Sequence, residues 1–204
     1  MLQNRVDPFG NIFKTEARGA LMGNRGLLHT HQREIVRAYR LHAWITCKLE
    51  FKGRRREVMA PGLYTELFFL DEATSFAAGH RPCFECRRVE AEKFKTHWLA
   101  GNPEFHFHRK ISIQQIDDIL HRERISAQDR KMTYEADPAS LPDGTFVALG
   151  DDAYLISCRQ MHRWTPFGYD KKIQLPPDIP LTVLTPKSIV NAFRSGYSAC
   201  MQLA

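Results

Sequence analysis

The chain has 204 residues, of which 43% are hydrophobic and 25% charged, as in a globular protein large enough to bury a sizeable core. No apolar run approaches the roughly 18–20 residues of a membrane helix, and the N-terminus has no hydrophobic signal region, so we expect a cytoplasmic protein without a membrane partner. The net charge of +6 favours an anionic partner, nucleic acid first.

The first half of the chain is predicted to contain short strands. Glycines punctuate residues 1–35, which we expect to be loop-rich. Apolar and polar residues then alternate over 44–51, the pattern of a half-buried strand, and residues 57–59 are expected to return as a second strand. A third, fully apolar strand is predicted at 67–70.

Three helices follow in the predicted order. Asp71 is placed to cap a helix that runs through Ala78 and ends at Gly79. The apolar spacing after it predicts a second helix over 88–99. Ser112, with Gln115 three residues later, predicts a capping box for a third helix.

The remaining segment is expected to be β-rich, with strands at 145–149, 154–158 and 181–184 and a last helix opened by Thr185 and Pro186. These elements predict an α+β fold in which antiparallel strands and short helices surround a zinc knuckle. We expect a single domain over 1–204, with a knuckle unit at 36–101 and a second α+β unit at 102–204.

The order of elements indicates a degenerate internal duplication. Cys47, an apolar strand, a capped helix, Gly79 and Cys83 occur in the first half. Cys158, an apolar strand, a capped helix, Gly196 and Cys200 follow in the same order later. The alternative is that strand, cap, helix and glycine form a common local arrangement in unrelated proteins.

The strongest chemical motif is Cys83-Phe84-Glu85-Cys86, because two cysteines at this spacing can bind one tetrahedral metal ion from a single turn. Five cysteines without a secretion signal favour reduced thiols over disulfides. Cys47 faces the core from its predicted strand, so we expect it to be a third zinc ligand. A redox pair and inert buried thiols are the alternatives.

Four residues are candidates for the fourth zinc ligand. His29, on the loop-rich N-terminal segment, is favoured over Cys158, His80 and His162. His80 lies three residues before Cys83, which makes simultaneous ligation awkward.

Residues 67–86, which contain the string Ala-Ala-Gly-His-Arg-Pro-Cys-Phe-Glu-Cys, resemble the second half of the Ada-type zinc-binding domain. That resemblance implies zinc bound by cysteines and contact with DNA phosphates. The family's first cysteine pair, which includes its methyl acceptor, would fall near Lys52 and Arg56, and neither residue is a cysteine. The resemblance therefore implies zinc binding and a basic surface without methyl transfer.

Arginines surround the knuckle in the sequence. They are expected to share one face and to bind phosphates of nucleic acid, since guanidinium groups pair well with phosphate oxygens. A solvated charged turn is the alternative. The six residues are Arg54, Arg55, Arg56, Arg81, Arg87 and Arg88.

A metal-assisted hydrolase or nuclease is the alternative function. Asp117 and His121 are spaced four residues apart on the predicted third helix, where they could share a proton or a metal, and Glu123 lies nearby. A protein-interaction module stapled by zinc is a further alternative. The leading prediction is a zinc-containing nucleic-acid-binding protein.

Overall fold

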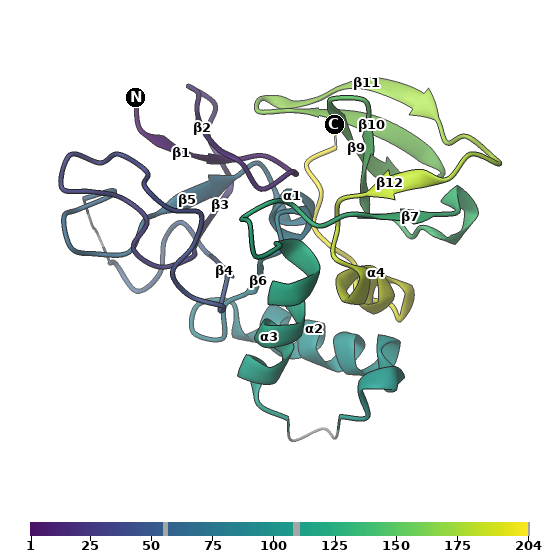
Figure 1. Cartoon of the computed structure of the whole chain (residues 1–204), viewed down its shortest axis with the longest axis horizontal. Helices are drawn as coiled ribbons and strands as arrows, with labels where there is room; N and C mark the ends of the chain where they lie inside the picture. The colour runs from purple at the N-terminus through teal and green to yellow at the C-terminus, as the bar shows by residue number, and fades with distance from the viewer. Residues whose placement is uncertain (55–56, 108–110, 204) are drawn as a thin grey trace.

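The computed structural model describes residues 1–54, 57–107 and 111–203. Within them the chain forms two six-stranded sheets and four α-helices (Figure 1), which confirms the predicted α+β class. The first sheet has the order β2 (Ile12–Lys14), β1 (Gln3–Val6), β5 (Leu67–Phe69), β3 (Leu21–Asn24), β4 (Ile45–Cys47) and β6 (Arg81–Pro82).

The first sheet is mixed rather than purely antiparallel. β1 runs parallel to β5 and β4 runs parallel to β6, while the other neighbours are antiparallel. Three of its strands lie in the segment predicted to be loop-rich, and residues 57–59 form no strand. The expected unit at 36–101 therefore lacks β1, β2 and β3, which belong to the same sheet.

Gly23 explains why the sequence pattern does not predict β3. It lies in β3 between β4 and β5, and a Cβ atom there would be 2.4 Å from the carbonyl oxygen of Ile45 and 2.8 Å from the Phe69 ring. A glycine at this position lets the neighbouring strands β4 and β5 approach closely. In the sequence alone, the same glycine indicates a turn.

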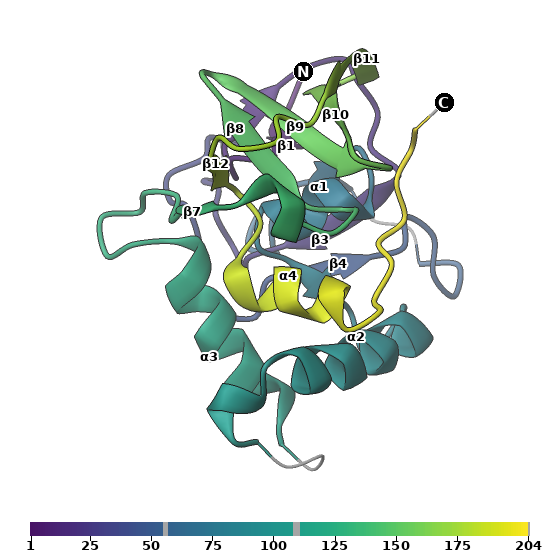
Figure 2. The same ribbon diagram turned by 90° about the vertical axis from the view of Figure 1, so that its right-hand side faces the viewer.

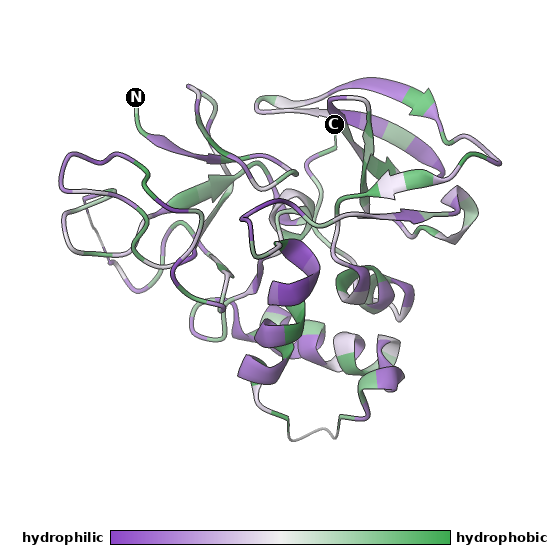
Figure 3. Cartoon of the chain, viewed as in Figure 1, coloured by the Kyte–Doolittle hydropathy of each residue, from purple (hydrophilic) through white to green (hydrophobic). Residues whose placement is uncertain are grey.

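The second sheet is antiparallel throughout. Its order is β11 (Gly168–Gln174), β10 (Gln160–Thr165), β9 (Asp152–Ser157), β8 (Phe146–Leu149), β12 (Leu181–Val183) and β7 (Tyr134–Ala136). β10 and β11 form a largely hydrophilic hairpin (Figure 3), and the sequence pattern predicts neither of them. The predicted strands at 145–149, 154–158 and 181–184 correspond to β8, β9 and β12.

The helices begin close to their predicted positions. They are α1 (Glu72–Ala77), α2 (Arg88–Gly101), α3 (Ile113–Arg124) and α4 (Lys187–Arg194), with single 3₁₀ turns at Pro103–Phe105 and Pro138–Ser140. Asp71 caps α1 by accepting a hydrogen bond from the Thr74 N–H at 2.8 Å, and α3 has the predicted capping box. Thr185 does not cap α4, because its hydroxyl accepts from the Phe146 N–H at 2.9 Å.

The main apolar core lies where the four helices meet the second sheet. α2 and α4 pack side by side below that sheet (Figure 2), and α1 lies between the two sheets (Figure 1). Phe76 of α1, Phe94 and Trp98 of α2, Leu155 of β9 and Phe193 near the end of α4 all belong to one buried cluster.

The two halves share a local order of elements but not a sheet order. β5 has one parallel and one antiparallel neighbour, whereas β12 has two antiparallel neighbours. Gly79 and Gly196 both follow a helix with positive φ, at 85° and 107°. The similarity of the halves is therefore confined to the strand–helix–glycine unit.

Candidate metal centre

The register of the first sheet brings the cysteines together. Parallel pairing places Thr46 of β4 opposite Pro82 of β6, and the Cys83 N–H donates to the Thr46 carbonyl at 3.0 Å. Cys47 ends β4 one residue later, so it lies beside Cys83. Cys47 is also held from its other side by pairing with Met22 of β3.

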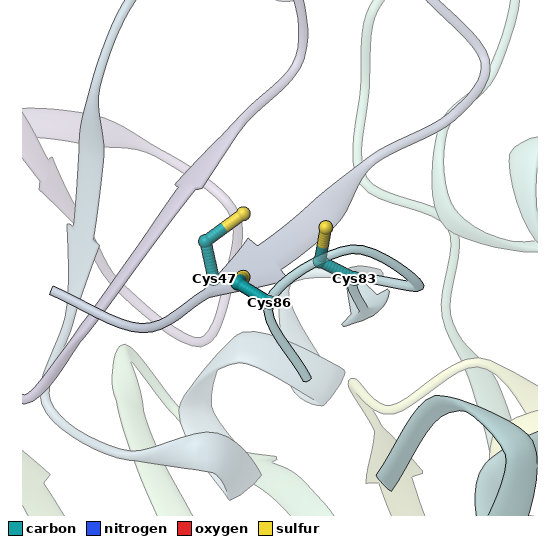
Figure 4. Close-up of side chains that lie close together, drawn as sticks. All are labelled: Cys47, Cys83 and Cys86. Carbon is teal, nitrogen blue, oxygen red and sulfur yellow. The ribbon is translucent and has the colours of Figure 1, made fainter. Parts of the chain in front are cut away.

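A tight turn supplies the remaining thiol. The Arg87 N–H donates to the Cys83 carbonyl at 3.0 Å, which closes the turn between β6 and α2 and places Cys86 next to Cys83. The three sulfur atoms lie within 4.8 Å of one another (Figure 4), and all three residues are buried. Zinc–sulfur bonds of about 2.3 Å place the sulfurs of a tetrahedral site about 3.8 Å apart, so a modest contraction would complete the site.

The turn already favours a thiolate. The Cys83 pKa is lowered to about 5, chiefly because the Cys47 thiol donates a hydrogen bond to its sulfur, and backbone N–H groups of the turn assist. The Glu85 N–H donates to the Cys83 sulfur at 3.3 Å. The pKa of Cys47 is raised, because its proton is held in that hydrogen bond and the thiol is buried. Zinc binds thiolates, so this donor set suits it.

The thiols open onto a pocket of about 480 Å³. Its walls include the apolar side chains of Ile45, Phe51 and Phe68. Glu66 also lines the pocket, although it is only 4% exposed. Its Oε2 accepts from the Met59 N–H at 2.7 Å, whereas its Oε1 is buried and has no hydrogen-bond partner among the described residues.

Glu66 is a site residue that sequence reasoning missed. A glutamate immediately before an apolar strand is ordinarily interpreted as the polar start of that strand. Its distance in sequence from the cysteines also matches no metal-binding motif. Only the fold turns its carboxylate toward the thiols' pocket.

The structure does not place His29, the predicted fourth ligand, with the three thiols. Its Nδ1 lies 2.6 Å from the Thr65 hydroxyl and its Nε2 lies 3.4 Å from the Ala60 carbonyl. His80 is fully buried, and its Nε2 accepts from Arg25 at 3.3 Å. In the part of the chain that the structure describes, no fourth histidine, cysteine or acidic residue joins the three thiols.

Arg81 does not face a nucleic acid, which corrects its predicted role. It is 5% exposed and makes two hydrogen bonds of 2.7 Å to the carboxylate of Asp117 on α3. Burial raises the pKa of Asp117, and the hydrogen bonds from Arg81 oppose that shift. The pair joins the metal-binding turn to α3 inside the molecule.

Arg87 is buried in the same way, so its predicted phosphate contact is also corrected. It pairs with Glu72 of α1, whose carboxylate accepts further hydrogen bonds of 2.9 Å from the Tyr197 hydroxyl and the Cys200 N–H. Arg87 therefore anchors the turn to α1 and to the C-terminal segment.

The remaining arginines lie at the surface or outside the described residues. Arg54 pairs with Glu85, and Arg88 pairs with Glu92 one helical turn away, both in exposed positions. Arg55 and Arg56 lie outside the described residues. The six arginines therefore do not form one surface, because Arg81 and Arg87 are buried.

The residues predicted for catalysis serve other contacts. Asp117 is held by Arg81 rather than by His121, which stacks on His42 at 4.0 Å. Burial and the nearby Arg124 lower the His121 pKa to about 4. Glu123 accepts hydrogen bonds from the N–H and hydroxyl of Ser188, which completes the first turn of α4.

Comparisons with protein-family models, with curated protein sequences and with solved structures found no match. The resemblance of residues 67–86 to the Ada-type domain therefore stays a prediction. None of the helices in the described ranges is both long and apolar enough to cross a membrane.

Proposed function

We propose that the protein is a zinc-dependent enzyme of the hydrolytic class, with the metal on Cys47, Cys83 and Cys86 and the substrate in the adjoining pocket. The proposal is carried by one observation: Glu66, whose buried Oε1 has no hydrogen-bond partner among the described residues, lines the same pocket as the three thiols.

The number of protein ligands supports a catalytic role. Structural zinc sites are usually closed by four protein ligands, whereas catalytic sites have three and leave one position for water or substrate. A zinc ion held in this way would supply a Lewis acid. The described residues provide three ligand atoms, and all three cysteines line the pocket.

Glu66 is suited to hold a proton during the reaction. Its Oε2 is fixed by the Met59 N–H, which orients the carboxylate, and its buried Oε1 has no hydrogen-bond partner among the described residues. General bases are commonly carboxylates that the protein holds at the edge of a substrate pocket. Glu66 would accept a proton from the attacking water and return it to the leaving group.

The pocket indicates the kind of substrate. Its volume of about 480 Å³ lies in the range of small-molecule sites, roughly 300–1,000 Å³. By area the walls are mainly apolar and include Ile45, Phe51 and Phe68. The polar and charged lining residues are Asn24, Lys48, Glu50, Arg54, Tyr64, Glu66 and Glu85. A small substrate with an apolar body and one hydrolysable polar group matches these walls.

The nucleic-acid alternative has less support. Two of its six arginines are buried in ion pairs, and the two exposed ones that the structure describes are each paired with a glutamate. The enzyme proposal accounts for both the thiols and Glu66.

Cobalt substitution tests whether the fourth position is open. Full-length protein loaded with Co²⁺ should show thiolate charge-transfer bands, and added imidazole should change the visible d–d bands because it enters the open position. Cys47→Ser should weaken the charge-transfer bands. Glu50→Gln, an exposed position on the same pocket, should leave the imidazole response intact. A spectrum insensitive to imidazole would mean a closed, structural site.

Ester hydrolysis tests the catalytic role. Zinc-loaded protein should hydrolyse p-nitrophenyl acetate, and Glu66→Gln should retain zinc while losing on the order of 100-fold or more in rate, the usual contribution of a general base. Glu50→Gln serves as the matched control. Equal rates for the wild type, Glu66→Gln and the zinc-free protein would refute the proposal.

A further inference from the structure

A second cavity, of about 230 Å³, is lined by none of the cysteines. Its walls carry four cationic residues and one acidic residue, Asp129. The cations are Arg25, which follows β3, Arg37, Arg124, which ends α3, and Lys131, and Trp44 lines the cavity with them.

Arg25, which lines this cavity, has one donor without a partner among the described residues. It is 2% exposed; its Nε donates to His80 at 3.3 Å and its Nη1 donates to the Gly10 carbonyl at 3.1 Å. Its Nη2 is buried and has no hydrogen-bond partner among the described residues. The guanidinium group lies 3.9 Å from the centre of the Trp44 ring, which fixes its plane.

Arg124 lies against the same indole, 4.0 Å from the ring centre. Its two terminal nitrogens donate to the carbonyls of Gly79 and His42, while its buried Nε has no partner among the described residues. Trp44 therefore holds two guanidinium groups beside one cavity, and each retains an unused N–H.

Among the described residues, none of the ion pairs includes Arg25, Arg124 or Lys131. The Lys131 ammonium donates to the Ala77 carbonyl, and the neighbouring Asp117 is already bound to Arg81. Two acidic residues are nearby. Asp7, whose two oxygens accept from Asn11, favours the charged forms of Arg25 and Lys131, and Asp129 lines the cavity.

Burying cations without counter-charges is unfavourable. Desolvation lowers the pKa of Arg25 to about 9 and that of Lys131 to about 7, and the cations repel one another. An anion in the cavity would pair with the unused donors and remove this cost.

We propose that this cavity binds a small oxyanion of the phosphate class, held by Arg25, Arg124 and Lys131. Residues with guanidinium and ammonium groups line it, the combination that recognises phosphate oxygens. The volume limits the ligand to inorganic phosphate or a small phosphorylated molecule. The proposal is independent of the zinc centre.

The test uses the full-length protein and inorganic phosphate. The melting temperature should rise with phosphate concentration and should not rise with chloride at matched ionic strength, because only a specific ligand stabilises the folded state by mass action. Titration calorimetry should give a saturable isotherm. Equal effects of phosphate and chloride on the wild type would overturn the proposal.

Two variants locate the site. Arg25→Gln and Lys131→Met should each weaken phosphate binding by tenfold or more, whereas Arg88→Gln, an exposed arginine on α2, should leave the Kd unchanged. Lys131→Met should also raise the melting temperature without phosphate, since it removes an uncompensated buried charge. Unchanged phosphate affinity in both cavity variants would refute the assignment.

Discussion

The arginines around the metal-binding turn differ more in their surroundings than in their sequence positions. Arg81 and Arg87 are about 5% exposed and pair with acidic residues of α3 and α1, whereas Arg88 projects from the first turn of α2. The sequence shows a basic cluster, but it does not show which carboxylates the fold brings to each arginine. The phosphate-binding prediction failed for this reason at Arg81 and Arg87.

The Arg81–Asp117 pair should be a major source of stability. Arg81→Met leaves Asp117 buried without its partner, so the free energy of unfolding should fall by about 3–5 kcal/mol. Arg88→Met breaks an exposed pair and should cost no more than about 0.5 kcal/mol. Urea denaturation of the two variants measures both values. Similar small losses would show that Arg81 is not part of a buried network; Asp117→Asn provides a second test if Arg81→Met does not fold.

His80 should make the protein sensitive to acid. It is buried against Arg25, and its pKa lies well below the usual value, chiefly because of desolvation. Below about pH 6.5 the unfolded state then binds a proton that the folded state excludes, so stability should fall as the pH decreases, by up to about 1.4 kcal/mol per pH unit for one such group.

His80→Gln keeps a polar side chain next to Arg25 but cannot titrate. The pH dependence of the free energy of unfolding between about pH 6.5 and 4.5 should therefore be shallower than in the wild type. His31→Gln, at an exposed loop position, is the control and should retain the wild-type slope. If His80→Gln had the same dependence of unfolding free energy on pH as the wild type, the claim that His80 is neutral in the folded state would be contradicted.

At the level of elements, the metal centre depends on two short strands. β4 has three residues and β6 has two, yet their pairing sets the separation of Cys47 from Cys83. Gly23→Ala would place a methyl group against the Ile45 carbonyl and the Phe69 ring. Because backbone must move to relieve this contact, the variant should lose about 1–3 kcal/mol of stability.

Gly23→Ala should also weaken metal binding, since the displaced β4 carries Cys47. Competition with a chromogenic chelator measures zinc affinity. Gly62→Asn is the control, because its φ of 78° suits asparagine and no atom lies within 4 Å of an added Cβ. If Gly23→Ala bound zinc as tightly as the control does, the zinc site would not depend on the register of the first sheet.

Elements with local signals were predictable from the sequence. The caps at Asp71 and Ser112 fix the starts of α1 and α3, and the Cys83–Cys86 spacing identifies the turn between β6 and α2. β3 contains Gly23, which serves packing, β1 and β2 have only four and three residues, and β10 and β11 are largely polar. None of these strands shows a sustained apolar alternation.

At the level of the whole molecule, residues in or next to β3 and β4 line two pockets of different chemistry. Met22, Ile45 and Cys47 line the thiol pocket, whereas Arg25 and Trp44 line the cationic cavity. Cys47 was predictable from its inward-facing position in an alternating strand. Glu66 and Arg25 were not, because their roles depend on contacts between residues far apart in the chain.

The most direct test of the central claim is zinc K-edge X-ray absorption on the purified full-length protein, with metal content measured in parallel. One zinc per chain should be coordinated by three sulfur atoms at about 2.3 Å and one lighter atom at about 2.0 Å. Cys47→Ser should reduce the sulfur count to two. A metal-free, stably folded wild type, or a fourth sulfur or histidine ligand, would contradict an open three-thiolate site.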